Sequence, residues 1–395
     1  MPPTTGSQTL PLRTAVRTHS FSESVIREMT RVARQHDAIN LAQGFPDFPA
    51  PQVLKDAACA AIQDDVNQYA VTWGSQNMRD ALVEKYRDWY GLEVEGDREI
   101  TVTCGATEAM ASVMLAVVDP GDEVIVLEPF YENYGPDAIL AQASPVFLPL
   151  EAPDYRIDPD RLASLMTDKT RAIVINTPNN PSGRVFDDAE MQAVADLCIK
   201  HDVLAITDEI YEHIIYEGSH IPLAKLPGMR DRTIIISGLS KTFSVTGWRV
   251  GTIIAPPDLT DAIRKVHDFL TVGAPAPLQE ACAVGMRSLG RDYYDDMAKG
   301  YAARRDILLS ALTDAGFGCS RPEGAYYIMA DFSELSDLDD RAFSHFLTED
   351  VGVAPVPGSS FFSGDGGRSL VRFVFCKQAP TLEEAGHRLR KFFAG

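Results

Sequence analysis

The chain has 395 residues, of which 45% belong to the apolar set AVILMFWYC and 23% are charged, a composition typical of globular proteins and unlike that of disordered or fibrous ones. Asp and Glu number 56 against 36 Lys and Arg, and the net charge of -20 disfavours nucleic acid or an anionic membrane as the main partner. No apolar run approaches the roughly 18 residues of a membrane span, and the segment 1–24 lacks the apolar stretch of a secretion signal. We therefore expect a soluble, cytoplasmic protein.

Metal and nucleotide motifs are missing from the sequence. The eight histidines show no HExxH or HxH spacing, and the six cysteines occur singly without CxxC pairs, so we expect no metal site and reduced thiols. Neither GxxxxGK[ST] nor a GxGxxG after a strand is present, which removes the commonest nucleotide-binding folds.

From residue 52 to 295, short β-branched runs alternate with longer amphipathic segments. This alternation predicts one large α/β domain with a mostly parallel sheet covered by helices. Helices are expected over Glu108–Val118, Asp187–His201 and Leu259–Leu270. Seven strands are expected, at Ile100–Cys104, Glu123–Glu128, Pro145–Leu150, Arg171–Asn176, Val203–Thr207, Thr233–Ser237 and Val250–Ala255.

The pattern changes near residue 296, and residues 296–395 are predicted to form a second, smaller α+β domain. Its expected elements are a long helix, two strands and a final helix, at Lys299–Ala315, Ala325–Asp331, Leu370–Phe375 and Thr381–Phe393. Residues 1–51 are interpreted as an N-terminal arm and a part of the small domain. The proline-rich segment 45–51 is expected to cross between the two domains.

Several chemically active residues follow directly on predicted strands. The breaker-rich segment 177–183 follows one strand, and in open α/β sheets ligands bind at the carboxyl ends of the strands. Lys241 lies just past the strand Thr233–Ser237 among small and hydroxyl residues, so its amine could be desolvated and act as a nucleophile toward an aldehyde. An ordinary exposed loop lysine is the other interpretation of the same pattern.

Two further features favour a cofactor at the same edge. Asp208 ends an apolar strand, where a buried carboxylate needs a cation such as a protonated ring nitrogen of a cofactor. The other interpretation is that Asp208 simply N-caps the next segment. Gly105, Ala106 and Thr107 join a strand to a helix, and small residues there let backbone N–H groups bind a phosphate.

Taken together, these motifs resemble those of class I, fold type I aminotransferases, which depend on pyridoxal 5'-phosphate (PLP). The resemblance runs from Asn40 to Phe375 and is most specific in the SxxSKTFSxTGWRxG segment over 237–251. The segments Gln43–Pro49 and Asn67–Tyr69 are most similar to the subgroup of kynurenine, glutamine and methionine aminotransferases.

The resemblance implies a role for each matching residue. Lys241 binds PLP covalently and moves a proton during the reaction, Asp208 pairs with the ring nitrogen, Tyr211 and Asn180 hydrogen-bond the 3'-oxygen, and Tyr131 stacks on the ring. Arg372 binds the substrate α-carboxylate with help from Asn180 and the Gly44 backbone. The phosphate is implied to contact Gly105, Ala106, Thr107, Ser240 and Arg249, with Tyr69 reaching it from the second subunit of a homodimer.

One position departs from the family pattern. Three residues before the lysine, many relatives have a hydroxyl residue that contacts the phosphate, and this chain has Gly238. Either Ser237 or Ser240 could take over that contact.

For the substrate, the sequence favours neutral or aromatic amino acids. One bacterial aspartate-using subgroup has a lysine where this chain has Thr107, although Arg264 or Lys265 could act from elsewhere. Four aromatic side chains are expected to favour an apolar substrate side chain, namely Phe45, Phe48, Tyr131 and Phe361. We expect transamination of an amino acid such as glutamine, methionine, kynurenine or an aromatic one with a 2-oxo acid such as 2-oxoglutarate.

Three alternatives stay open at this point. The enzyme could be an aspartate aminotransferase, or the same scaffold could eliminate a β leaving group from cysteine conjugates or cystathionine. PLP-fold modules also serve as sensors in transcription regulators, which carry a separate DNA-binding domain. Only about 40 residues precede the fold here, and the strongly acidic charge argues against DNA binding.

Overall fold

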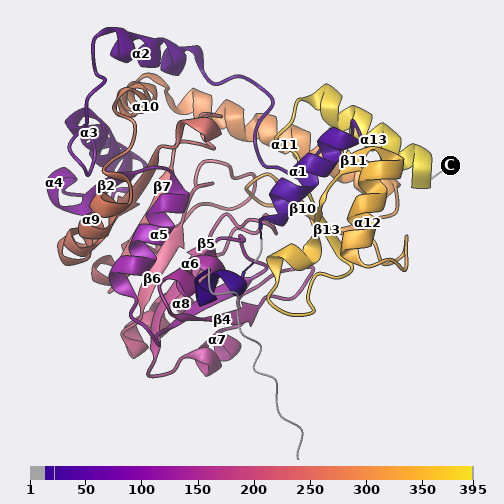
Figure 1. Ribbon diagram of the computed structural model, residues 1–395, viewed down its shortest axis with the longest axis horizontal. Helices are drawn as coiled ribbons and strands as arrows, with labels where there is room; N and C mark the ends of the chain where they lie inside the picture. The colour runs from indigo at the N-terminus through magenta and orange to yellow at the C-terminus, as the bar shows by residue number, and fades with distance from the viewer. Residues whose placement is uncertain (1–13, 22, 394–395) are drawn as a thin grey trace, which may run out of the picture.

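A computed structural model of the chain describes residues 14–21 and 23–393 (Figure 1). The segment 1–13, part of the region expected to lack a secretion signal, lies outside the described residues. Two sheets organise the structure, a seven-stranded one in the larger part of the chain and a four-stranded one toward the C-terminus. Within the described part of the chain, no helix is both long and apolar enough to cross a membrane.

The large sheet contains all seven predicted strands, each within one residue of its predicted bounds. They are β2 (Ile100–Thr103), β3 (Glu123–Glu128), β4 (Ser144–Pro149), β5 (Thr170–Asn176), β6 (Leu204–Asp208), β7 (Thr233–Gly238) and β8 (Gly251–Ile254). The strand order is β2-β8-β7-β6-β5-β3-β4. β8 runs antiparallel to β2 and β7, and the other neighbours are parallel, so the predicted mostly parallel sheet is confirmed.

Helices cover both faces of this sheet because alternate strand residues point to opposite sides. In β3, Val124 and Val126 pack in one core with α5, α6 and α9, whereas Ile125 and Leu127 pack in another with α7 and α8. Their bounds are α5 (Ala106–Val117), α6 (Tyr134–Leu140), α7 (Pro159–Leu165), α8 (Asp188–His201) and α9 (Pro257–Thr271). Asp187 and Glu190 form a reciprocal capping box at the start of α8, which explains why the predicted helix begins there.

A third group of helices packs beside β2 and β8 (Figure 1). These are α2 (Gln52–Gln63), α3 (Gln76–Lys85), α4 (Gly96–Glu99) and α10 (Ala276–Ser288). Short 3-10 or π turns occur at η1 (Val16–His19), η2 (Tyr86–Tyr90), η3 (Leu223–Lys225), η4 (Arg230–Arg232), η5 (Thr246–Trp248), η6 (Leu347–Val351) and η7 (Gly358–Phe361). The apolar faces of α2, α3 and α10 meet in one core with the strands of this edge.

The C-terminal part forms an antiparallel sheet in the order β12-β13-β10-β9, covered by three helices. The strands are β9 (Gly318–Cys319), β10 (Tyr327–Asp331), β12 (Val356–Pro357) and β13 (Leu370–Val374). The helices are α11 (Arg291–Asp314), α12 (Asp340–Phe346) and α13 (Ala379–Phe393). α11 begins eight residues before the predicted Lys299, so the boundary proposed between residues 295 and 296 lies inside this helix.

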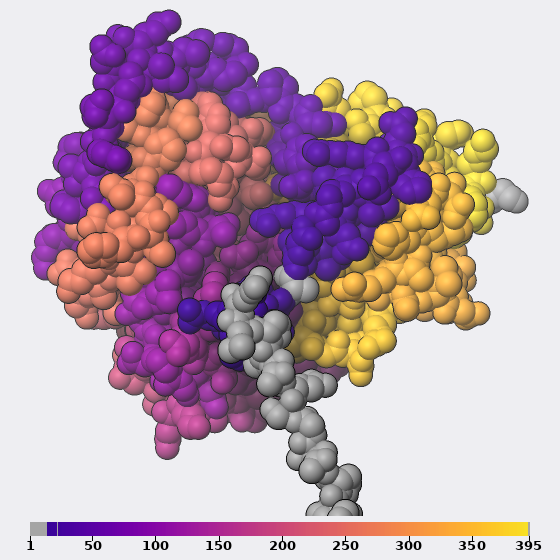
Figure 2. Space-filling view, viewed as in Figure 1, coloured from indigo at the N-terminus to yellow at the C-terminus, as the bar shows by residue number. Residues whose placement is uncertain are grey.

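The N-terminal segment lies against the C-terminal part, as the indigo and yellow atoms in Figure 2 show. β1 (Ile39–Asn40) pairs in parallel with β11 (Val353–Ala354), and α1 (Val25–Gln35) precedes it. Further along, the buried Lys377 donates to the Phe45 carbonyl oxygen at 2.8 Å. Residues 39–45 are therefore held by the C-terminal part of the chain rather than by the large sheet.

Candidate active site

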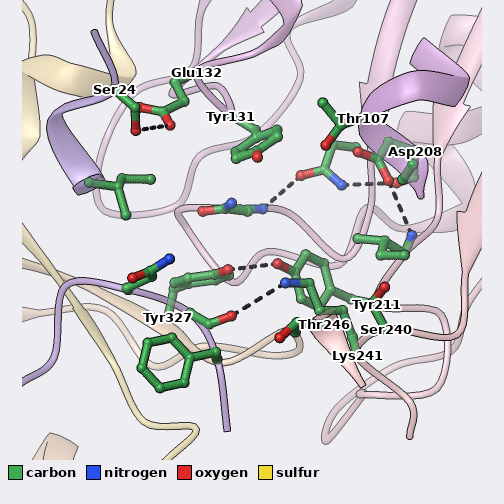
Figure 3. A pocket seen from close by; sticks show the side chains of 18 of the residues that line it. Ser24, Thr107, Tyr131, Glu132, Asp208, Tyr211, Ser240, Lys241, Thr246 and Tyr327 are labelled. Carbon is green, nitrogen blue, oxygen red and sulfur yellow. Dashed lines mark hydrogen bonds between the residues drawn. The ribbon is translucent and has the colours of Figure 1, made fainter. Parts of the chain in front are cut away.

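A cavity of about 470 Å³ lies where the carboxyl ends of the large-sheet strands face the smaller part of the chain (Figure 3). Twelve of the residues singled out in the sequence line it: Gly44, Phe45, Ala106, Thr107, Tyr131, Asn180, Asp208, Tyr211, Ser240, Lys241, Arg249 and Arg372. They come from both parts of the chain, because the strands of one sheet end against the segment that the other sheet holds. Of the remaining predicted residues, Gly105 contacts Arg249, and Tyr69 does not line the cavity.

Lys241 follows β7 by three residues and extends into the cavity (Figure 3). Its Nζ donates a long hydrogen bond of 3.3 Å to the Gly44 carbonyl oxygen and lies 5.8 Å from the centre of the Tyr326 ring. Burial lowers the pKa of Lys241 to about 8. A substantial fraction of this amine is therefore neutral, and so nucleophilic, at neutral to mildly alkaline pH.

Asp208 ends β6 at the floor of the same cavity, and its side chain is buried. Its carboxylate accepts hydrogen bonds from the Tyr134 hydroxyl at 2.7 Å and from the Ile210 backbone N–H at 3.2 Å. Burial raises the pKa of Asp208, against the effect of these two donors. The bond from Ile210 also means that Asp208 caps the turn that follows β6, so the capping interpretation and a cavity-lining carboxylate hold together.

Two asparagines connect the floor of the cavity to Arg372. The Asn176 side chain donates to the Asp208 carbonyl oxygen at 2.9 Å, and its own oxygen accepts from the Asn180 N–H at 2.7 Å. This pairing follows from the register of the sheet, in which Asn176 lies opposite Asp208. The Asn180 side-chain oxygen in turn accepts from Arg372 at 2.8 Å.

Arg372 is a buried cation on β13, only 1% exposed. One guanidinium nitrogen donates to Asn180, and the other donates to the Ala42 carbonyl oxygen at 2.7 Å. The rings of Tyr327 and Phe361 lie 4.4 and 4.7 Å from the guanidinium carbon. Among the described residues no carboxylate lies within 4.0 Å of it, and its Nε–H has no acceptor. A buried charge without a counterion calls for an anionic ligand.

A second anion site lies at the start of α5. Gly105 occupies the N-cap with φ of +82°, and a Cβ on it would lie 2.3 Å from the Arg249 guanidinium. Gly251 allows the same close approach from β8, because its Cβ would lie 2.3 Å from the Gly105 carbonyl carbon. The first amides of α5, the guanidinium of Arg249 and the hydroxyl residues Thr107 and Ser240 therefore gather at one end of the cavity, a combination suited to phosphate.

The position that departs from the family pattern has no space for a side chain. A Cβ on Gly238 would lie 2.9 Å from the Val250 carbonyl oxygen and 3.1 Å from Ile210. Ser237 is buried away from the cavity, where its hydroxyl donates to Glu212. Of the two serines considered as replacements, only Ser240 lines the cavity.

Tyrosines form one wall of the cavity. The hydroxyls of Tyr211 and Tyr327 lie 2.6 Å apart, and burial raises the pKa of Tyr211 well above its usual value and that of Tyr327 to about 12. Both phenols are therefore protonated donors at neutral pH. Tyr131 lies across the cavity from them, with its ring edge-on to Tyr134 at 5.8 Å (Figure 3).

Several lining residues were not predicted. Tyr134 could have been found, because it lies three residues after Tyr131 and so near it at the start of α6. Nothing in the local sequence marks Tyr327 or Arg27 as lining residues, since the small sheet and α1 bring them to the cavity from distant parts of the chain. The remaining unpredicted ones are Ser24, Ile26, Gln43, Glu132, Asn176, Ile210, Thr246 and Gly247.

Some substrate predictions were wrong in detail. Phe45 and Tyr131 line the cavity, but Phe48 packs on Tyr301 at 5.9 Å, and Phe361 lies behind Arg372. Neither of the basic residues considered as a distant cation lines the cavity. Arg264 stacks on Trp73 and donates to the carbonyl oxygens of Asp97 and Ile100, and Lys265 is not among the lining residues.

Tyr69 lies on the surface, 87% exposed, beside other exposed apolar residues. Thr72 donates to Asp268 at 3.4 Å and accepts from His267 at 2.9 Å through its carbonyl oxygen, so the end of the segment 66–72 meets the segment 267–272 there. We name the exposed apolar residues of these two segments the Tyr69 patch: Val66, Tyr69, Val71, Phe269, Leu270 and Val272.

His267 connects the Tyr69 patch to the phosphate end of the cavity. Its Nδ1 lies 3.0 Å from the Glu108 carboxylate and its Nε2 lies 2.9 Å from the Thr72 carbonyl oxygen. Both partners are acceptors, so the imidazole donates from both nitrogens only when it is protonated. Burial opposes the charge, but the hydrogen bond to Glu108 and the charge of that carboxylate outweigh it and raise the pKa of His267; Asp268 adds to this effect.

This geometry predicts a pH-dependent contribution to stability. The pKa of His267 is higher in the folded chain than in the unfolded chain. Its protonation therefore stabilises the fold fully at pH values below the pKa of the unfolded chain, and this stabilisation is lost as the pH rises through the pKa of the folded chain. His267→Gln is expected to destabilise the chain by about 1–3 kcal/mol at pH 6 and by less at pH 9. Thermal unfolding of both proteins across this range measures the difference. A difference in Tm that stays constant or grows with pH would show that His267 is neutral.

The family model described as "Aminotransferase class I and II" matches residues 36–389. The chain is 37% identical over 369 residues to methionine aminotransferase from Escherichia coli (strain K12), covering 93% of this chain and 95% of the relative. It is also 35% identical over 414 residues to the kynurenine--oxoglutarate transaminase of Dictyostelium discoideum, covering 95% of each.

A solved structure gives the same result for the fold. N-succinyldiaminopimelate aminotransferase from Mycobacterium tuberculosis superposes on this chain with a TM-score of 0.93 at 38% identity, over 95% of this chain and 99% of the other. These similarities span both sheets and every residue that lines the cavity from Gln43 onward.

Proposed function

Because this chain belongs to the class I and II aminotransferase family, we propose that it transfers the amino group of a neutral or aromatic L-amino acid to a 2-oxo acid, with 2-oxoglutarate as the acceptor. The aminotransferase fold, fold type I, and the PLP cofactor follow from the family. The resemblance to methionine and kynurenine aminotransferases is confirmed by the relatives that match. The donor, the acceptor and the roles of individual residues are our proposal.

The cavity fits PLP at three separate points. Gly105, Ala106, Thr107, Ser240 and Arg249 would hold the phosphate, where the α5 N-terminus and a guanidinium meet. Asp208, a buried carboxylate that no cation of the described chain neutralises within 4.0 Å, would hold a protonated ring nitrogen. The partly neutral Lys241 would bind the aldehyde. When bound, PLP supplies an aldehyde that takes up the amino group and a ring that accepts electrons from the α-carbon.

The chain's own residues then orient the substrate and move its proton. Arg372 and Asn180 hold the α-carboxylate, which places the α-carbon near Lys241. Lys241 Nζ would take the α-proton as a general base. Tyr211, a protonated phenol, would donate to the cofactor's 3'-oxygen together with Asn180, and Tyr131 would cover the face of the ring.

One observation carries the proposal: a buried arginine without a counterion, a buried carboxylate and a lysine of lowered pKa open onto the same cavity. Each of these three groups alone has a structural explanation, because buried charged groups in structural networks also have shifted pKa values. Together they match an amino-acid substrate bound over a cofactor ring: the arginine would bind the α-carboxylate, the lysine would lie near the amino group, and the carboxylate would pair with a cationic ring nitrogen.

Arg372→Lys is expected to lower kcat/KM for all amino-acid donors by about 100-fold, because lysine cannot reproduce the planar fork that donates two parallel hydrogen bonds. The loss is expected mainly in KM, since the lost contact is made to bound substrate before the reaction. Steady-state kinetics with two donors measures it. An unchanged KM for every donor would contradict the role of Arg372 in binding the α-carboxylate.

The preference for neutral donors rests on three apolar or aromatic lining residues, Ile26, Phe45 and Tyr131. It rests also on Thr107, which stands where one aspartate-using subgroup has a lysine. The test is kcat/KM for glutamine, methionine, phenylalanine, kynurenine and aspartate with 2-oxoglutarate. Neutral or aromatic donors are expected to be the better substrates. If aspartate exceeded every one of them by more than tenfold, the proposed donor class would be wrong.

We further propose that the enzyme is a homodimer in which a second copy covers the Tyr69 patch. Phe269 is 91% exposed and Tyr69 87%, and large apolar patches on a surface mark interaction sites. The patch lies next to the phosphate end of the cavity, because Cys104 just before Gly105 contacts the Gly273 carbonyl oxygen at 3.5 Å. This position supports a Tyr69 that reaches the phosphate of the partner subunit.

A complementation experiment tests the shared site. Tyr69→Ala and Lys241→Ala homodimers are each expected to have little activity. If the sites are shared, a mixed dimer contains one site with both defects and one intact site, so random mixing restores about a quarter of the wild-type activity. Mixtures that stay as inactive as their components would contradict the exchange of Tyr69. In parallel, Phe269→Glu is expected to give monomers in light scattering.

A further inference from the structure

Four cationic side chains line the cavity: Arg27, Lys241, Arg249 and Arg372. Lys241 is the proposed amine, Arg249 lies at the phosphate end, and Arg372 faces the α-carboxylate. Arg27 has no place in that arrangement. It is an exposed residue in the first turn of α1, at a part of the cavity built from the N-terminal segment.

The first turn of α1 fixes Arg27 at this end of the cavity. Ser24 is the N-cap of α1, and its side-chain oxygen accepts from the Arg27 backbone N–H at 3.4 Å. The Ser24 hydroxyl donates to Glu132, which follows Tyr131 in the cavity wall. In Figure 3 this Ser24–Glu132 pair lies on the opposite side of the cavity from Asp208, Ser240 and Lys241. A substrate side chain pointing away from the phosphate end is therefore directed toward this pair and its neighbour Arg27.

The charge of Arg27 is available to a ligand. In residues 14–21 and 23–393, no carboxylate lies within 4.0 Å of its guanidinium, whereas Arg31, one turn further along α1, pairs with Glu23 at 2.6 Å. Glu132 is the acidic residue at the same end of the cavity, and its carboxylate accepts from Ser24. Without Arg27, the carboxylate of Glu132 would remain at this end and would repel a second carboxylate.

We propose that Arg27 is the specificity-determining residue for dicarboxylic substrates, binding the distal carboxylate of a 2-oxo dicarboxylic acid while Arg372 binds its α-carboxylate. The inference rests on the proposed function, and it identifies the residue that recognises the amino-group acceptor of that reaction. Two carboxylates then meet two separate guanidinium groups that line one cavity. A neutral donor uses the same space differently, since its side chain contacts Ile26 and Tyr131 and leaves Arg27 in solvent.

The test compares two acceptors in Arg27→Gln. 2-Oxoglutarate carries the distal carboxylate, and the 2-oxo acid of methionine has an uncharged side chain of similar length. The variant is expected to lose at least 30-fold in kcat/KM for 2-oxoglutarate and less than threefold for the methionine-derived acceptor. The conversion of bound PLP by methionine alone, followed by absorbance, is expected to proceed at the wild-type rate. Arg31→Gln, on the same helix but paired with Glu23, is the matched control and is expected to leave both acceptors unchanged.

The outcomes separate this inference from the proposed function. An equal loss with both acceptors, or no loss with either, would overturn the role of Arg27 while transamination stands. If the wild-type protein transaminated neither acceptor from any donor, the proposed function itself would fail. A loss for 2-oxoglutarate in Arg31→Gln as large as that in Arg27→Gln would show a general effect of charge on α1 and would also overturn the assignment.

Discussion

Lys241→Ala is expected to abolish turnover, with kcat reduced by at least 10⁴-fold. The reason is that this side chain has two functions in the proposal, holding the cofactor covalently and moving the α-proton. Its burial lowers the pKa of the amine to about 8, and no other lysine lines the cavity among the described residues. Kinetics with methionine and 2-oxoglutarate, and the visible absorbance of the purified protein, measure the two losses separately.

The variant is expected to remain folded and to bind PLP weakly, because Asp208, Arg249 and the α5 N-terminus are unchanged. Lys265→Ala is the matched control: this lysine lies on α9 outside the cavity, and its loss is expected to leave activity at the wild-type level. Activity of Lys241→Ala within tenfold of the wild type, with the fold intact, would remove Lys241 from the mechanism.

Asp208→Ala is expected to lower kcat/KM by at least 10³-fold, equivalent to about 4 kcal/mol of transition-state stabilisation. Burial raises the pKa of Asp208 in the chain alone, and a cationic ring nitrogen bound against it would reverse this shift. Without the carboxylate, the ring nitrogen loses its proton and the ring accepts electrons less well. The loss is therefore expected in kcat and kcat/KM together, measured with the PLP-saturated variant.

A second buried carboxylate provides the control for Asp208. Asp137 on α6 is 6% exposed and does not line the cavity, and burial raises its pKa to about 7. Asp137→Asn is expected to keep kcat/KM within threefold of the wild type. A value for Asp208→Ala that also stayed within tenfold would contradict the pairing of Asp208 with the cofactor.

The large sheet could be predicted closely because all of its strands except the edge strand β4 are largely buried on both faces. Continuous β-branched runs such as Ile234–Ile236 in β7 leave little freedom in where a strand begins and ends. The start of α11 was harder to predict. The helix begins at Arg291 rather than Lys299, since the Gly290 that precedes it is followed by residues with no clear apolar spacing.

The site could be predicted where a residue follows a strand of the large sheet. Lys241 and Asp208 are such residues, and the sheet itself brings them to one edge. Residues supplied by other parts of the chain could not be found in this way. Tyr327 and Arg27 reach the cavity only because the smaller sheet and α1 pack over it, a tertiary arrangement that local spacing does not encode.

The central claim is that this cavity binds PLP and uses it to accept an amino group. The most direct measurement is the absorption spectrum of the purified, PLP-loaded protein while amino acids are added one at a time without any 2-oxo acid. We predict a visible PLP band that converts to the pyridoxamine form with glutamine, methionine or phenylalanine and only slowly with aspartate. A protein with no visible band even after PLP is added, or a band that no amino acid converts, would contradict the account.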